Sequence, residues 1–146
     1  MRIIVVGDSH GDNKTLERIA QIEYKANVFL HAGDSQSQPE EIRPFLAIRG
    51  NCDFFIPNLQ PNIIIDTDYG KLYMQHFPIS LPDMKRLREE GVRIFIHGHT
   101  HTKEDKKYDD FYYFSPGSCS RPRDDGPSYL VIETTSDSLT YEFKSI

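Results

Sequence analysis

The stretch from Ile3 to Gly11 reads IIVVGDSHG, in which four β-branched apolar residues are followed directly by glycine, aspartate, serine and histidine. An apolar run of this kind predicts a short strand that is buried on both faces, as in a parallel sheet. The polar residues then lie at the carboxyl end of the strand, where open α/β sheets carry their binding sites. The same pattern of strand and polar loop recurs along the chain and decides the predicted fold.

Three further apolar runs, at 28–30, 47–48 and 92–96, are each followed within a few residues by glycine and a polar residue. They predict three more buried strands. Apolar residues at helical spacing predict a helix over 13–24, between the first two strands. A second helix is predicted over 82–90, between a proline and a glycine and immediately before the strand at 92–96. Both arrangements are typical of strand–helix–strand units with parallel pairing.

The last third of the chain has a different pattern. Short β-type runs at 111–114, 128–133 and 139–143 are separated by turn-forming residues, and we expect them to pair as antiparallel strands. Two more runs, at 63–66 and 71–75, predict a central hairpin. The segment 103–107 mixes positive and negative charges, which is typical of a solvated loop.

These elements predict an α/β fold with four layers, αββα, in which two mixed β-sheets lie face to face and helices flank them. The first half is expected to be parallel and the second half mainly antiparallel. A length of 146 residues is that of one ordinary domain. We therefore expect a single domain that covers residues 1–146.

The composition limits the classes of function. The chain has 17 Lys and Arg against 22 Asp and Glu, a net charge of −5. This acidic balance disfavours binding to long stretches of nucleic acid, which needs clustered cations. Two cysteines are too few for a disulfide framework, and the apolar N-terminus is too short for a signal peptide or a membrane span. We expect a cytoplasmic protein without a membrane partner.

Residues that can bind metal ions gather in the loops after the predicted strands. In two of these loops the candidates alternate, so that both side chains of a pair can point into one small volume. The full set is Asp8, His10, Asp34, Asn51, His76, His99 and His101. Its nitrogen and oxygen donors suit manganese, iron, nickel, cobalt or zinc better than calcium or magnesium. Seven ligands with one shared carboxylate predict two ions, and Asp34, alone in its motif, is the candidate bridge.

Other catalytic motifs are absent from the sequence. The first strand lacks the glycine patterns of dinucleotide-binding and Walker-type phosphate loops, and Ser118 has no nucleophile elbow. A dehalogenase-like phosphatase would need a second aspartate where His10 stands. His31 and His97 do not fit the alternation of ligands, and we expect them to be packed or supporting histidines.

The ordered motifs Gly-Asp-x-His, Gly-Asp, Gly-Asn-Cys-Asp, His and Gly-His-Thr-His resemble those of the calcineurin-like metallophosphoesterase family. Gly-Asn-Cys-Asp in so short a chain is similar to the YfcE-type small phosphodiesterases of that family. The resemblance implies a two-sheet sandwich flanked by helices, two divalent transition-metal ions with manganese the first choice, and catalytic roles for Asp34, Asn51 and His99. It implies that one ion is held by Asp8, His10, Asp34 and His101, and the other by Asp34, Asn51, His76 and His99.

The implied reaction is direct hydrolysis of a small phosphoester. A hydroxide held between two ions attacks phosphorus in line, so no protein nucleophile is needed. Many larger family members carry histidine where this chain has Cys52, and a thiol is a poorer acid at neutral pH. We therefore expect a preference for phosphodiesters with good leaving groups. The candidate substrate contacts are Asn51, Cys52, Arg121 and Arg123, although the arginines also fit a solvated charge pair and Cys52 also fits simple packing.

Two positions depart from the family pattern, since Phe77 follows His76 where glycine is usual and Ser115 replaces the asparagine of Asn-Pro-Gly-Ser. Two alternatives to the phosphodiesterase stay open. One is a non-catalytic interaction scaffold of the same fold, as a retromer subunit is, which the full set of seven ligand types disfavours. The other is a nuclease, which the lack of a basic stripe disfavours. The sequence also leaves homo-oligomerisation open.

Overall fold

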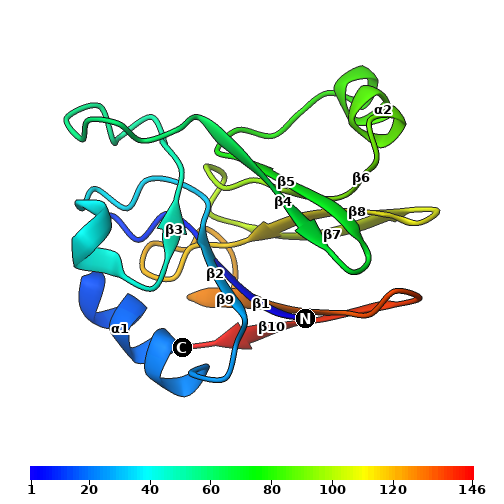
Figure 1. Cartoon of the computed structure of the whole chain (residues 1–146). Helices are drawn as coiled ribbons and strands as arrows, with labels where there is room; N and C mark the ends of the chain where they lie inside the picture. Colours follow the sequence, from blue (N-terminus) through cyan, green and yellow to red (C-terminus); the bar gives the residue numbers. More distant parts are fainter.

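Two five-stranded β-sheets face each other, and a helix covers the outer side of each (Figure 1). The computed structural model describes residues 1–146. The first sheet has the order β10 (Leu139–Ser145), β9 (Ser128–Thr134), β1 (Arg2–Val6), β2 (Val28–His31), β3 (Leu46–Ala47). The second has the order β4 (Asn62–Thr67), β5 (Gly70–Gln75), β6 (Val92–Ile96), β8 (Phe111–Pro116), β7 (Lys103–Tyr108). The helices are α1 (Asn13–Ile22), the 3₁₀ turn η1 (Pro39–Ile42) and α2 (Leu81–Glu89).

Both sheets are mixed. In the first, β1 pairs parallel with β2 and antiparallel with β9, and β2 pairs parallel with β3. In the second, β6 pairs parallel with both β5 and β8, while β4 and β7 are antiparallel edge strands. The carboxyl ends of β1, β2, β3, β5 and β6 therefore lead into the loops that carry the candidate ligands.

The apolar run of β1 is buried on both faces, as its sequence predicts. Ile3 and Val5 point into the core between the two sheets, and Ile4 and Val6 pack under α1. Burying each such side chain contributes about 1.5–3 kcal/mol. Because its two faces pack against different elements, β1 stabilises both the contact between the sheets and the contact with α1. On the far side of the molecule, Met84 of α2 packs on the outer face of the second sheet. Neither α-helix combines the length and the hydrophobicity that a membrane crossing requires.

The charged segment 103–107 is not a loop, so this prediction is wrong. It forms most of β7, which pairs antiparallel with β8 over its whole length. An edge strand pairs through its backbone with only one neighbouring strand, so its charged side chains can stay in water. The expected mutual pairing of the last three strands is also wrong in part. β9 and β10 pair antiparallel, but β8 belongs to the other sheet.

Helix boundaries differ only slightly from the prediction. α1 ends at Ile22, two residues earlier than expected, and Asp12 caps its start by accepting a hydrogen bond from the backbone N–H of Thr15. α2 starts at Leu81 after the cap Ser80. The strand at 92–96 has the predicted bounds.

A buried carboxylate ties the two ends of the chain to α1. Glu23 is 4% exposed and accepts hydrogen bonds from Arg2 at 2.7 Å, from the Tyr129 hydroxyl at 2.8 Å and from Lys144 at 2.9 Å. Burial alone would raise the pKa of Glu23, but the hydrogen bonds from Lys144, Arg2 and Tyr129 outweigh it and lower the pKa from 4.5 to about 2.

Glu23→Gln is expected to lower the free energy of unfolding by about 2–3 kcal/mol at neutral pH, because it removes the charge that Arg2 and Lys144 face. Since the folded-state pKa is depressed, the contribution of Glu23 is complete above its ordinary pKa and is lost as pH falls toward about 2. Urea unfolding of metal-free protein across this pH range measures it. The control is Glu133→Gln, which removes a largely exposed partner of the same arginine and should have little effect. Equal losses in the two variants would contradict the assignment.

Candidate metal centre

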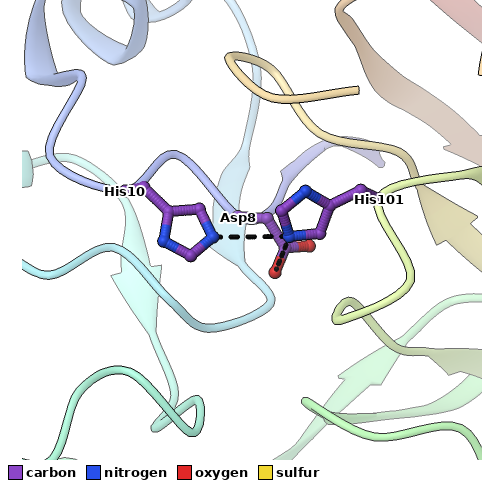
Figure 2. Close-up of side chains that lie close together, drawn as sticks. All are labelled: Asp8, His10 and His101. Atoms are coloured by element: carbon purple, nitrogen blue, oxygen red, sulfur yellow. Dashed lines mark hydrogen bonds and ion pairs between the residues drawn. The ribbon is translucent and has the colours of Figure 1, made fainter. Parts of the chain in front are cut away.

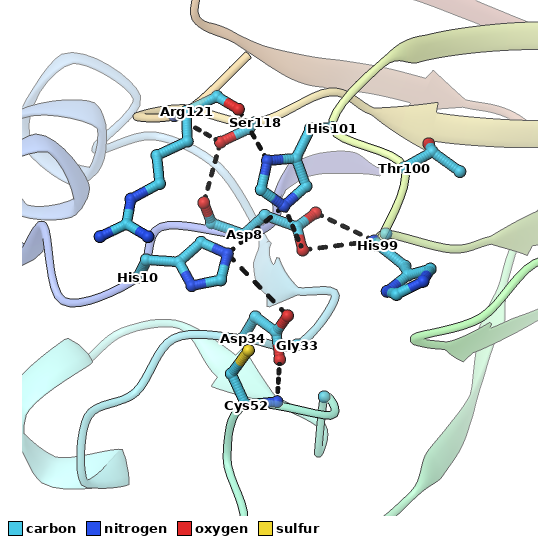
Figure 3. Close-up of polar contacts among 12 residues, drawn as sticks. Asp8, His10, Gly33, Asp34, Cys52, His99, Thr100, His101, Ser118 and Arg121 are labelled. Carbon is cyan, nitrogen blue, oxygen red and sulfur yellow. Dashed lines mark hydrogen bonds and ion pairs between the residues drawn. The ribbon is translucent and has the colours of Figure 1, made fainter. Parts of the chain in front are cut away.

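All seven candidate ligands lie on loops that follow strand ends. Figure 3 shows Asp8, His10, Asp34, His99 and His101 gathered at one rim of the molecule. Asp8 and His10 follow β1, Asp34 follows β2, and Asn51 lies in the loop after β3. His76 follows β5, and His99 and His101 follow β6. The loops of both sheets thus contribute side chains to one site, as expected for strand ends that meet at a common edge.

The backbone at these positions is unusual. Five of the seven residues have positive φ angles, namely Asp8 at 51°, His10 at 46°, Asp34 at 61°, His99 at 71° and His101 at 59°. Each such conformation costs a residue with a side chain about 1–2 kcal/mol. Backbone hydrogen bonds between the loops hold it, among them one from the N–H of Asp8 to the carbonyl of Gly33 at 3.0 Å. Backbone strain that is concentrated at one group of neighbouring residues is typical of a functional site.

Asp8, His10 and His101 form the first group of donors (Figure 2). Nε2 of His10 lies 3.3 Å from Nε2 of His101, which in turn lies 3.5 Å from Oδ1 of Asp8. The other ring nitrogens are used elsewhere, since Nδ1 of His10 donates to Oε1 of Gln36 and Nδ1 of His101 donates to the carbonyl of Arg121, both at 2.7 Å. In the tautomer that carries its proton on Nδ1, each ring has its lone pair on Nε2, and the two Nε2 atoms face each other. A cation between them would stabilise this arrangement.

His76 is the centre of the second group. Its Nδ1 donates to the carbonyl of Ala32 at 2.8 Å, so its Nε2 is directed into the site, 3.2 Å from Oδ2 of Asp34 and 2.9 Å from Oδ1 of Asn51. Oδ1 of Asn51 also lies 3.1 Å from Nδ1 of His99. Four side chains from four loops thus converge on a second small volume.

Two carboxylates lie between the groups. Oδ2 of Asp34 is 3.2 Å from Nε2 of His76 and 3.9 Å from Nε2 of His10. Oδ1 of Asp8 is 3.5 Å from Nε2 of His101 and 3.9 Å from Nε2 of His76. Asp34 is where a bridging ligand would have to lie, and its role as the bridge stays a prediction. The equivalent placement of Asp8 was not predicted from its motif.

The two aspartates have opposite electrostatic environments. Burial raises the pKa of Asp8 from 3.8 to about 7, with His76 opposing the shift and the neighbouring Asp34 adding to it. Burial also acts on Asp34, but hydrogen bonds from His76 and from the backbone N–H of Cys52 outweigh it and lower the pKa of Asp34 to about 2. A buried carboxylate with a raised pKa lacks a counter-charge, which a bound cation would supply.

The donor chemistry therefore fits divalent transition-metal ions. Three sets of donor atoms lie within 4.8 Å of one another: Asp8, His10 and His101; Asp8, Asp34 and His76; and His10, Asp34 and Cys52. Imidazole and carboxylate ligands together suit manganese, iron, cobalt, nickel or zinc. Asp34 accepts a hydrogen bond from the N–H of Cys52 at 2.8 Å and Asp8 one from the N–H of His99 at 3.0 Å, and the remaining carboxylate oxygens face the imidazoles.

A family model described as the calcineurin-like phosphoesterase superfamily domain matches residues 1–137. The chain belongs to this superfamily, whose members are metal-dependent phosphoesterases. The family predicted from the motifs is thereby confirmed. Among its relatives, the probable metallophosphoesterase YsnB of Bacillus subtilis is 25% identical, over 98% of this chain and 90% of its own length. A probable metallophosphoesterase of Methanothermobacter thermautotrophicus is 27% identical, over 97% and 91%.

Solved structures with the same fold confirm the predicted α/β sandwich. A predicted phosphoesterase from Streptococcus pneumoniae superimposes with a TM-score of 0.86 at 24% identity, over 99% of this chain and 88% of that one. YfcE, a phosphoesterase from E. coli, gives 0.69 at 20% identity, over 91% and 88%. Vps29 from Entamoeba histolytica, solved in complex with Zn²⁺, gives 0.72 at 19% identity, over 99% and 98%.

A cavity of about 360 Å³ opens over the candidate ligands of this phosphoesterase fold. Its walls include all four predicted substrate contacts, Asn51, Cys52, Arg121 and Arg123. The arginine loop is joined to His101, which donates from Nδ1 to the carbonyl of Arg121 and accepts at its own carbonyl from the N–H of Arg123 at 2.9 Å. A larger surface hollow of about 540 Å³ lies beside α2 and contains none of these residues.

Two supporting residues were missed by sequence reasoning. The carboxylate of Asp53 accepts hydrogen bonds from the backbone N–H groups of Asp34, Gln36 and Gly50 at 2.7–2.8 Å, and it thereby joins two ligand loops. Gln36 orients the ring of His10. Asp53 belongs to the Gly-Asn-Cys-Asp motif, so its position was a usable signal. No spacing rule would have found Gln36.

The remaining histidines are buried among protein groups, as predicted. Nε2 of His31 lies 2.8 Å from the hydroxyl of Ser9, and Nε2 of His97 lies 3.1 Å from Oε1 of Glu104 on β7. Burial lowers the pKa of both rings. Ser115, which stands where the family motif has asparagine, has a buried hydroxyl without a hydrogen-bond partner.

Proposed function

We propose that the protein is a phosphodiesterase that uses two divalent metal ions, manganese by preference, and hydrolyses small phosphoesters through a single domain that covers residues 1–146. The observation that carries this proposal is the contact between the Nε2 atoms of His10 and His101 at 3.3 Å beside Asp8. When Nδ1 carries the proton, the Nε2 atom of each imidazole offers a lone pair, and a cation between the two Nε2 atoms would accept both.

In this proposal the residues act in two sets. Asp8, His10, Asp34 and His101 hold one ion, and Asp34, Asn51, His76 and His99 hold the other. When bound, the ions lower the pKa of water toward about 7 and neutralise charge on phosphoryl oxygens. The backbone hydrogen bonds to Asp53 and the partners of each Nδ1 atom keep the ligands oriented.

The substrate would bind in the cavity above Asp34. Arg121 and Arg123 line its wall. The neighbouring carboxylates of Asp124 and Asp125 pair with Lys103 and not with these arginines, so the guanidinium groups are available to phosphate oxygens. Asp34, Asn51 and His99 would lie next to the reacting phosphorus. Because the reaction needs no protein nucleophile, we expect no covalent phosphoenzyme, and trapping of a phosphorylated residue during turnover would contradict direct hydrolysis.

The second candidate is a non-catalytic interaction scaffold. Its support is the fold shared with Vps29, including a wild-type structure that contains Zn²⁺. Bound metal alone therefore does not distinguish the two functions, and turnover does. Full metal occupancy without hydrolysis of any diester or monoester would favour the scaffold.

The test measures metal content and hydrolysis together. Protein purified without chelators is analysed for metals and then assayed with bis(p-nitrophenyl) phosphate and added Mn²⁺. We expect about two metal ions per chain, hydrolysis that is lost with EDTA and restored by Mn²⁺, and much slower turnover of glycerol phosphate. Faster turnover of glycerol phosphate than of the aryl diester would contradict the proposed preference.

Cys52→His is expected to raise kcat/KM for glycerol phosphate by at least about tenfold and to change the rate with the aryl diester little. Cys52 lines the cavity, and burial together with the carboxylate of Asp34 raises the pKa of its thiol, which makes it a poor proton donor. An imidazole at this position can protonate an alkoxide leaving group at neutral pH. Cys52→Ser is the control and should show no gain. A similar gain in both variants would refute acid catalysis from this position.

A further inference from the structure

The ring of Phe77 lies beside two candidate ligands. Its centroid is 4.8 Å from that of His99 and 5.1 Å from that of His76, and the two imidazoles are 5.2 Å apart. Phe77 nevertheless remains 47% exposed, so one part of the ring packs on the histidines and another part faces solvent. Phe77 does not itself line the cavity of about 360 Å³, but it packs on His99, which does. A flat group that extends past His99 could therefore contact the exposed part of the Phe77 ring.

The backbone of Phe77 is held in position before any ligand arrives. Its carbonyl accepts a hydrogen bond from Nε2 of Gln75 at 2.7 Å, and Oε1 of Gln75 in turn lies 3.2 Å from the hydroxyl of Tyr73. Pro78 follows and restricts the backbone of Phe77 itself. The backbone is thus fixed, and the ring itself is held by its packing on His76 and His99, so it loses little conformational entropy on contact with a ligand.

The site thus has two different sides. Arg121 and Arg123 belong to the loop that hydrogen-bonds with His101, on the side of the first ligand group. Phe77 packs on His76 and His99, on the side of the second group. A phosphoester seated over both groups would meet guanidinium groups at one end and an apolar ring at the other.

We propose that Phe77 forms an aromatic subsite that receives the flat ring of a phosphoester substituent, either a simple aryl group or a nucleobase. The proposal rests on the proposed function for the position of the phosphoryl group and specifies the substrate class. Phe77 acts here as a specificity-determining residue.

The test compares two ligands that cannot be hydrolysed. Calorimetry of the Mn²⁺-loaded protein measures the affinities for phenylphosphonate and methylphosphonate. Contact with one aromatic ring contributes about 0.5–1.5 kcal/mol, so phenylphosphonate should bind about twofold to twelvefold more tightly. Phe77→Ala should abolish this ratio, and Phe77→Tyr should retain it. Leu81→Ala, which also shortens an exposed apolar side chain and lies four residues further along the chain, should leave the ratio unchanged.

A second pair of ligands distinguishes the two kinds of ring. Adenosine 5′-monophosphate and ribose 5-phosphate differ only in the base. A Phe77-dependent preference for the nucleotide would identify a nucleobase as the natural ring, and a preference confined to phenylphosphonate would identify a short aryl substituent.

Equal affinity of the wild type for both phosphonates would overturn the subsite. So would an equal weakening of both in Phe77→Ala, because Phe77 would then act only by positioning His99. If the ring preference is found but no diester is hydrolysed, the subsite stands and the proposed phosphodiesterase fails. If diesters are hydrolysed without a ring preference, the proposed phosphodiesterase stands and the subsite fails.

Discussion

Asp34→Asn is expected to reduce diester hydrolysis by more than about a hundredfold and to lower the metal content below two ions per chain. Asp34 lies between the two ligand groups, 3.2 Å from His76 and 3.9 Å from His10. A neutral amide at this position removes the negative charge that would be shared by two cations. Loss of partners outside the first ligand shell already costs about 10–100-fold in metal affinity or activity, so loss of a shared ligand should cost more.

The fold should survive this substitution. Asparagine has the shape of aspartate, and its Oδ1 can still accept the hydrogen bond that Asp34 receives from the N–H of Cys52 at 2.8 Å. Metal analysis, the diester assay and thermal unfolding of the metal-free protein are measured in parallel, with Asp66→Asn on the exposed side of β4 as the control. Full metal content and wild-type turnover in Asp34→Asn would show that Asp34 is not the bridge.

Gly50→Ala is expected to reduce the stability by about 1–3 kcal/mol and diester hydrolysis by more than about tenfold. A Cβ atom on Gly50 would lie 2.5 Å from the backbone nitrogen of Asp34 and 2.7 Å from its Cγ. Because the nearest atoms belong to a buried ligand and its backbone, they cannot move aside without displacing the candidate bridge. The backbone N–H of Gly50 also donates to Asp53 at 2.7 Å, so a shift of Gly50 would disturb the second ligand loop as well.

The matched control is Gly7→Ala. Gly7 also precedes a candidate ligand, but its Cβ would lie 3.4 Å from the nearest atom, Cγ of Pro116, which is ordinary van der Waals contact. Urea unfolding and the diester assay should separate the two variants clearly. Tolerance of alanine at position 50, or equal damage at position 7, would show that the close approach of these loops is not required.

Much of the fold could be predicted because its strongest signals are local. The run Ile3–Val6 is apolar on both faces since both faces are buried, and β6 begins and ends at the predicted residues. β7 could not be predicted in this way. Its residues carry exposed charges and lack an apolar pattern, although β7 forms a tight hairpin with β8 in which Tyr108 pairs with Phe111.

The candidate site also combines features that local sequence predicts with features that depend on tertiary contacts. Polar residues after the strands, most of them preceded by glycine, identify the seven candidate ligands, because the carboxyl ends of neighbouring strands must share an edge. The position of Asp8 between both groups, the hydrogen bonds to Asp53 and the contact of Phe77 with His99 depend on distances between loops. No periodicity along the chain encodes those distances.

By itself the sequence determined most of the buried strands, the candidate metal ligands and the family to which the chain belongs. Those properties follow from hydrophobic periodicity and side-chain chemistry, which act over a few residues. Only the tertiary structure decided which donor atoms face each other and which histidine packs against Phe77. The reason is physical: convergence of side chains is set by how two sheets pack and how their loops hydrogen-bond across the rim, and these contacts join residues far apart in the chain.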